Sequence, residues 1–129
     1  MDITRKSGRE GLFLAPSWEL LNPVLVARKA LDASRAARND ADELARATLG
    51  FVEAWDAYVV GYRDQMRASY RSHRDAWDAL LARSSVTLVC YCTDHLHCHR
   101  TLLATQILPA LGAHYAGEVE ARINRKTKQ

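Results

Sequence analysis

The chain has 129 residues, 48% of them hydrophobic, and a formal net charge of +3. This length and composition suit one compact domain, which we place at residues 1–119, followed by a basic tail at residues 120–129. The last nine residues hold four basic side chains and no acidic one, so the positive charge is largely an effect of the tail. A broad nucleic-acid-binding face is therefore not indicated, and contact with nucleic acid stays open only for the tail.

The apolar stretches and the cysteines bear on the compartment. No apolar stretch approaches the roughly 20 residues that a membrane helix needs, and no signal-peptide core follows the N-terminus. The three cysteines, Cys90, Cys92 and Cys98, lie within nine positions, unlike the disulfide framework of a small secreted domain. We expect a soluble, cytoplasmic protein with reduced thiols and no membrane partner.

Helical patterns dominate the first part of the chain. A short apolar run at residues 12–15 is consistent with a buried strand, and Ser17 can cap a helix that begins at Trp18 and is short or bent because of Pro23. Asp40 offers a cap for a second helix from about Ala41. Between residues 44 and 70 bulky side chains recur three and four positions apart, so one face of a long helix is apolar and aromatic. Such a stripe is typical of a core, and homodimerisation through it stays open.

The remaining pattern predicts a helix, a strand and another helix. Residues 73–83 are amphipathic with helical spacing. Residues 86–92 are β-branched and apolar, as in a strand buried on both faces of a parallel sheet. Residues 98–111 then return to a helical pattern that ends at Pro109 and Gly112. We therefore expect an α/β domain with a short, mostly parallel sheet and predominantly helical content.

Most of the chemically reactive side chains gather between this strand and this helix. Residues 90–100 hold all three cysteines, three of the five histidines, an aspartate and an arginine, at the strand–loop–helix position where α/β proteins bind ligands. The first amides of the helix, its dipole and Arg100 together favour an anion there. The same surroundings would stabilise a thiolate at Cys98, which makes it the candidate nucleophile, with His99 as the candidate acid or base.

Two further side chains are candidates for contact with a ligand, and one metal is an alternative. Cys92 projects to the same side as Cys90 if the strand continues through both, because a strand alternates with a period of two. Asp94 can bind a ribose hydroxyl, orient a histidine or form a turn. We expect no cofactor; the alternative is zinc, for which Cys90, Cys92, Cys98 and His99 are suitable ligands in a spacing that is not a standard one.

Several stretches together carry a resemblance. They are residues 2–8, residues 15–21, the aromatic helix, and above all the strand at residues 86–92 leading into Cys98-His99-Arg100 and a leucine-rich helix. In these stretches, which span nearly the whole chain up to Gly112, the sequence resembles a family catalogued as domain of unknown function number 488. The resemblance implies a small Rossmann-like, three-layer α/β domain. Members of that family often have a further strand before the segment that here follows Met1.

The resemblance also implies a pocket in which distant segments meet. Its residues would be Arg5, Lys6, Ser17, Cys98, His99 and Arg100. We expect a domain that binds an anionic small molecule, such as a nucleotide or a nucleobase-containing compound, and that acts on it as a hydrolase or transferase. Cys98 is then the nucleophile, His99 the acid or base, and Arg100 with Arg5 and Lys6 the anion clamp. The alternative is a non-catalytic module that binds zinc, a protein or nucleic acid.

Overall fold

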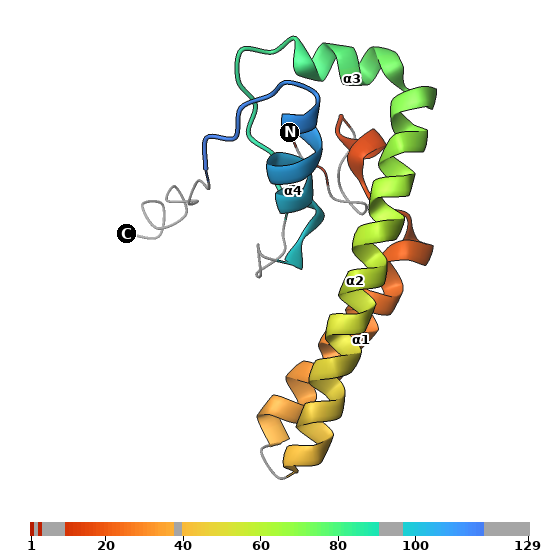
Figure 1. The fold of residues 1–129 in the computed structure, drawn as a ribbon, viewed down its shortest axis with the longest axis vertical. Coiled ribbons are helices and arrows are strands. Elements are labelled where there is room, and N and C mark those ends of the chain that lie inside the picture. The colour runs from red at the N-terminus through yellow and green to blue at the C-terminus, as the bar shows by residue number, and fades with distance from the viewer. Residues whose placement is uncertain (2, 4–9, 38–39, 91–96, 118–129) are drawn as a thin grey trace.

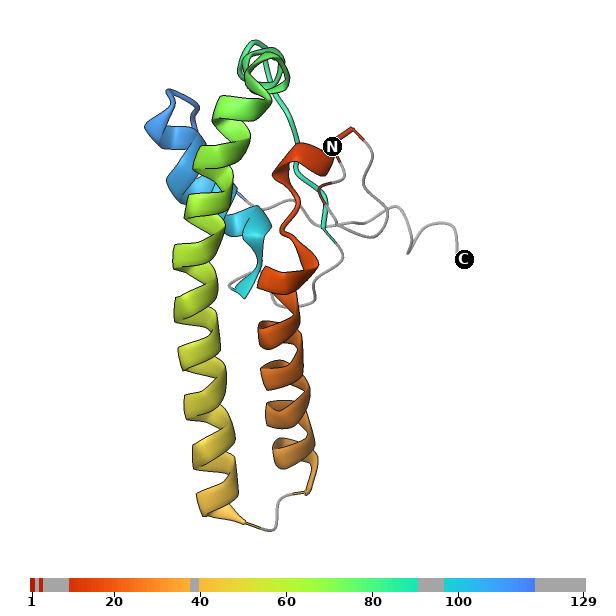
Figure 2. The ribbon, with the colours of Figure 1, turned by 90° about the vertical axis from the view of Figure 1, so that its right-hand side faces the viewer.

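The computed structural model describes residues 1, 3, 10–37, 40–90 and 97–117. α1 and α2 form a long antiparallel hairpin, α3 crosses the end of α2, and the stretch from α4 to α5 lies beside the half of α2 nearest α3 (Figure 1 and Figure 2). Within those ranges no helix is both long and apolar enough to cross a membrane. The elements in chain order are the 3-10 helix η1 (Leu12–Leu14), α1 (Trp18–Ala37), α2 (Ala41–Ser72), α3 (Arg74–Leu81), α4 (His99–Leu102), the π-helix η3 (Leu103–Ile107) and α5 (Leu108–Ala110).

α2 begins at Ala41 because Asp40 caps it. The Oδ1 atom of Asp40 accepts hydrogen bonds from the amides of Asp42 at 2.9 Å and Glu43 at 3.2 Å, two of the donors that a helix start leaves unpaired. The face that packs into the core carries residues three, four and seven positions apart, as the sequence pattern predicts. The long helix, its cap and its aromatic stripe are confirmed. The buried residues of α2 are Phe51, Tyr58, Tyr62, Met66 and Ser69.

α1 continues through Pro23 as one helix of 20 residues, so the expectation of a short first helix was wrong. Proline in a helix interior removes one hydrogen bond and crowds the preceding turn, at a cost of about 3 kcal/mol. Val24 and Leu31 are buried in the core that α1 shares with α2, and each such burial contributes about 1.5–3 kcal/mol. The two helices also approach closely at Gly61, where an added Cβ would overlap the side chain of Leu20.

The predicted α/β fold with a parallel sheet, and with it the Rossmann-like three-layer arrangement, was wrong. All regular elements in the described ranges are helices. The backbone of residues 86–90, the described part of the predicted strand, pairs with the start of the chain: the amide of Ile3 donates to the Val89 carbonyl at 2.9 Å, and the Val89 amide donates to the Met1 carbonyl at 2.7 Å. A parallel sheet needs several strands with helices on both faces, whereas most residues between Trp18 and Ser72 form the hairpin of α1 and α2.

Polar side chains of α2 explain why the apolar run at residues 12–15 is not a strand. Tyr62, Gln65 and Ser69 donate hydrogen bonds to the carbonyls of residues 14, 15 and 13, at 2.6, 2.9 and 2.7 Å respectively. Their three- and four-residue spacing places these donors on one face of the helix. The indole of Trp77 in turn donates to the Ser69 hydroxyl at 3.0 Å. Side chains therefore satisfy carbonyl groups that would otherwise need a neighbouring strand.

Candidate functional site

Cys98 and His99 form a buried thiol–imidazole pair. The Sγ atom of Cys98 lies 3.9 Å from Nδ1 of His99, and Nε2 of His99 lies 2.8 Å from the carbonyl oxygen of Ile3. Because a carbonyl only accepts, the partner assigns the proton to Nε2, and Nδ1 of the neutral ring faces the thiol with its lone pair. Burial lowers the pKa of His99 from its ordinary value, since it disfavours the charged ring.

The surrounding elements fix the orientation of this pair. Cys98 has extended backbone angles, φ −141° and ψ 143°, and α4 begins at the next residue. Tyr62 from α2 packs edge-on against the His99 ring with centroids 5.7 Å apart. Burial raises the pKa of Tyr62 well above its ordinary value, so its phenol stays protonated and keeps donating to the Leu14 carbonyl. The imidazole is therefore held by α2 on one side and by the Ile3 carbonyl on the other.

A cavity of about 270 Å³ opens beside the pair and is bordered by α1 and α2. Arg28 and Asp32, one turn apart on α1, are its charged residues, and the Arg28 guanidinium lies 4.3 Å from the centroid of the Phe51 ring. A cavity of this size fits a small ligand rather than a macromolecule. The aromatic side chains of its walls can stack on a flat ligand. The Arg28 guanidinium can bind an anionic group of that ligand, and the Asp32 carboxylate can accept a hydrogen bond from it. The aromatic wall consists of Phe51, Trp55, Tyr58 and His97.

Cys90 and Arg100 lie next to the pair. Nη1 of Arg100 donates to the Cys90 carbonyl at 3.5 Å, and Arg100 does not line the cavity. Three potential metal-ligand atoms lie within 4.8 Å of one another: the Sγ atoms of Cys90 and Cys98 and a ring nitrogen of His99. Zinc binds thiolate at about 2.3 Å and imidazole at about 2.0 Å, so these three ligand atoms could close around one ion with small shifts.

The structure brings together four of the residues predicted from the sequence, namely Cys90, Cys98, His99 and Arg100. Ser17 does not line the cavity; its hydroxyl accepts a hydrogen bond from the Leu20 amide at 3.2 Å and so caps α1. The other predicted site residues lie outside the described ranges and stay predictions. These are Arg5, Lys6, Cys92 and Asp94.

Sequence reasoning missed the part of the cavity that α1 and α2 supply. Arg28 and Asp32 are four positions apart, which is one turn of a helix, but nothing in the sequence places that turn opposite Cys98. Trp55 belongs to the stripe that the pattern assigns to the core, and it is only partly buried because the cavity opens beside it. The sequence shows that Arg28 and Asp32 lie on the same face of a helix, but it does not show that this face lies across the cavity from Cys98.

Comparison with known proteins agrees with the resemblance drawn from the Cys98-His99-Arg100 segment. The model of a family described as DUF488-N3a, the active DUF488-N3 subclade, matches residues 13–110. The matched range includes both helices of the hairpin and the thiol–imidazole pair. Neither the curated proteins nor the solved structures contain a match to the chain. Because the match covers far more than half of its length, the chain belongs to the family of domain of unknown function 488, in the subclade DUF488-N3a.

Proposed function

We propose that the cavity beside Cys98 and His99 binds an anionic small molecule and that Cys98 attacks this molecule as a thiol nucleophile. The observation that carries the proposal is the position of His99 Nδ1, which lies 3.9 Å from the Cys98 sulfur while Nε2 lies 2.8 Å from the Ile3 carbonyl. A proton that passes from Sγ to Nδ1 leaves a thiolate, and the protonated ring then serves as the acid for the leaving group. This chemistry is that of a hydrolase or transferase with a covalent thiol intermediate.

The cavity suggests how the substrate is held. Arg28 replaces Arg100 in the role of anion clamp, because it lines the cavity and Arg100 bonds to the Cys90 carbonyl instead. The aromatic wall favours a flat ligand, and a nucleotide or nucleobase-containing compound has the required combination of ring and charge. The three cysteines lie within nine positions, unlike the disulfide framework of a small secreted domain, which supports a reducing compartment such as the cytoplasm.

A ligand panel on three single variants tests this proposal. Thermal shifts of the full chain are measured with nucleotides, nucleobases and phosphorylated sugars, and mass spectrometry detects adducts on Cys98. We expect Arg28→Gln to remove the thermal shift caused by the ligand that stabilises the native chain. Cys98→Ser should keep this shift but no longer form the adduct or convert the ligand to product. Arg35→Gln changes an exposed arginine on the same helix and should change neither. An Arg28→Gln protein with an unaltered shift and turnover would overturn the proposal.

Zinc binding is a second candidate, favoured by the cluster of ligand atoms of Cys90, Cys98 and His99. A histidine that ligates a metal almost always donates its other ring N–H to a carbonyl or carboxylate, and His99 donates in this way to Ile3. Cys92, which lies outside the described ranges, would be the fourth ligand. Elemental analysis separates the two candidates: one zinc per chain, lost together with folding on chelation, favours a structural module, and metal-free folded protein excludes it.

A further inference from the structure

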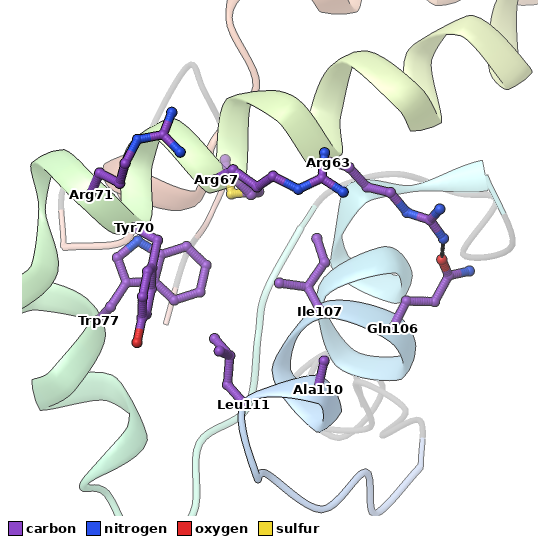
Figure 3. Close-up of a pocket in the computed structure, with 10 residues that line it drawn as sticks. Arg63, Arg67, Tyr70, Arg71, Trp77, Gln106, Ile107, Ala110 and Leu111 are labelled. Atoms are coloured by element: carbon purple, nitrogen blue, oxygen red, sulfur yellow. Dashed lines mark hydrogen bonds between the residues drawn. The ribbon is translucent and has the colours of Figure 1, made fainter.

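A second cavity, of about 440 Å³, lies on another part of the molecule. It is bordered by α2, α3 and the stretch from η3 to α5, and it shares no lining residue with the cavity beside Cys98. Figure 3 shows three arginines of α2 along one side of the hollow, with Ile107, Ala110 and Leu111 facing them from the other helical stretch. A size of 300–1,000 Å³ is typical of sites for small molecules.

The α2 side of this cavity is strongly basic. Arg63, Arg67 and Arg71 follow one another at four-residue spacing, so they lie on one face of the helix, and all three are exposed. No carboxylate is among the described residues that line the cavity. Arg67 is paired with Asp64 at 2.7 Å, but both side chains are 67% exposed. A pair this exposed is weak, so an anionic ligand can displace Asp64.

The floor and the opposite side are apolar. Met66 and Trp77 are 2% and 1% exposed and form the base of the cavity. Tyr70 is partly buried and stands at one end, with its ring edge-on to Trp77 at a centroid distance of 5.6 Å. A ligand that filled the cavity would therefore place an apolar body on this floor and its charges along the arginines. Neither an inorganic anion nor an uncharged molecule uses both surfaces.

A distortion of the backbone shapes the same cavity. η3 is a π-helix in which the Leu108 amide donates to the Leu103 carbonyl five residues back. Pro109 follows directly; it lacks an N–H, and its ring crowds the carbonyl four residues earlier, which favours a wider turn. The widened turn carries Gln106 and Ile107, and Gln106 accepts a hydrogen bond from Arg63 across the cavity (Figure 3). π-helical turns are rare and are frequently found at functional sites.

We propose that this cavity binds an organic polyanion, a small molecule with two or more phosphate or carboxylate groups on an apolar body. Guanidinium groups bind phosphate and carboxylate through paired, charge-assisted hydrogen bonds, and three of them one turn apart suit more than one anionic group. The site lies outside the cavity assigned to the thiol chemistry and does not depend on it.

Three probes test the proposal by isothermal calorimetry on the full chain. ATP has both an apolar body and several charges, inorganic triphosphate has only the charges, and adenosine has only the body. We expect ATP to bind at this cavity about tenfold or more tightly than either other probe, because only ATP uses both surfaces. The double variant Arg67→Gln/Arg71→Gln should weaken ATP binding about tenfold or more. Ala110→Trp should weaken it as well, since the indole fills the apolar side without changing charge.

Two controls separate this site from general attraction and from the first cavity. Arg35→Gln/Arg46→Gln removes two exposed arginines that do not line either cavity and should leave ATP binding unchanged. Arg28→Gln acts on the first cavity alone, so it removes any ATP bound there and should leave unchanged the ATP binding that the Arg67→Gln/Arg71→Gln pair weakens. The proposal is wrong if none of the probes binds, if the control pair weakens ATP as much as the Arg67/Arg71 pair, or if only Arg28→Gln weakens it.

Discussion

Two amide substitutions at His99 isolate the hydrogen bond that orients the thiol–imidazole pair. Glutamine places an amide nitrogen at the position of Nε2, so His99→Gln can keep the bond to the Ile3 carbonyl and lose Nδ1. Asparagine reaches only as far as Nδ1, so His99→Asn leaves that carbonyl without its donor. Ile3 is fully buried, and an unsatisfied buried carbonyl costs about 1–3 kcal/mol.

The magnitudes of both variants follow from the contacts of His99. Both lose the edge-on contact with Tyr62, worth about 0.5–1.5 kcal/mol. We therefore expect His99→Gln to lower the free energy of unfolding by about 1 kcal/mol and His99→Asn by about 2–4 kcal/mol. Urea denaturation measures both values, and a difference of 2 kcal/mol also corresponds to roughly 8 °C in Tm. Equal destabilisation by the two variants would refute the assigned tautomer and the role of the Ile3 carbonyl.

Three further predictions concern the folded state, and urea denaturation checks each. Ser69→Ala leaves the buried Trp77 indole N–H and a backbone carbonyl unsatisfied, so it should lower the free energy of unfolding by about 2–4 kcal/mol. The control Thr48→Ala removes an exposed hydroxyl of the same helix and should lower it by less than about 0.5 kcal/mol. Similar losses in the two variants would contradict the account. Asp40→Ala removes the α2 cap and should cost about 1 kcal/mol, and an unchanged stability would contradict the capping role. Because burial lowers the pKa of His99, its contribution is complete above about pH 6.5 and falls as pH drops toward the folded-state pKa; His99→Gln should flatten this part of the curve, and an equally steep curve would show that other groups cause it.

Local sequence signals predict the long helix and its position well. Asp40 follows a break in the helical pattern and precedes an acidic first turn, and the structure shows the cap that this arrangement predicts. The spacing of Phe51, Tyr58 and Tyr62 gives the buried face of α2 directly. These features depend on residues close in sequence, so the chain itself holds the information.

Features that depend on distant partners were not predictable in the same way. Residues 86–90 have the composition of a buried strand, but a sheet needs several neighbouring strands, and among the described residues the backbone of this segment pairs with that of Met1 and Ile3. Pro23 predicts a break, yet packing of α1 on α2 overrides its local cost. Both errors came from treating a local preference as if the tertiary contacts agreed with it.

The site divides along the same line. The sequence motif names the neighbours Cys98 and His99 as candidates, and the structure places Sγ and Nδ1 3.9 Å apart. Arg28 comes from a helix about seventy positions away, and sequence spacing cannot place it in the same cavity. Arg100 carries the charge that the motif suggests, but its direction depends on the Cys90 carbonyl, which is set by the fold.

The reactivity of Cys98 tests the thiol–imidazole pair most directly. Iodoacetamide labelling of the folded chain is followed at Cys98 by peptide mass spectrometry between about pH 5 and 9, with Arg35→Gln, an exposed change outside both cavities, as the reference variant. With Nδ1 as proton acceptor, Cys98 should react about tenfold faster near pH 7 in the native sequence than in His99→Gln, and Arg35→Gln should react as the native sequence does. Equal Cys98 rates in the two proteins across this range would contradict the pairing and the function built on it.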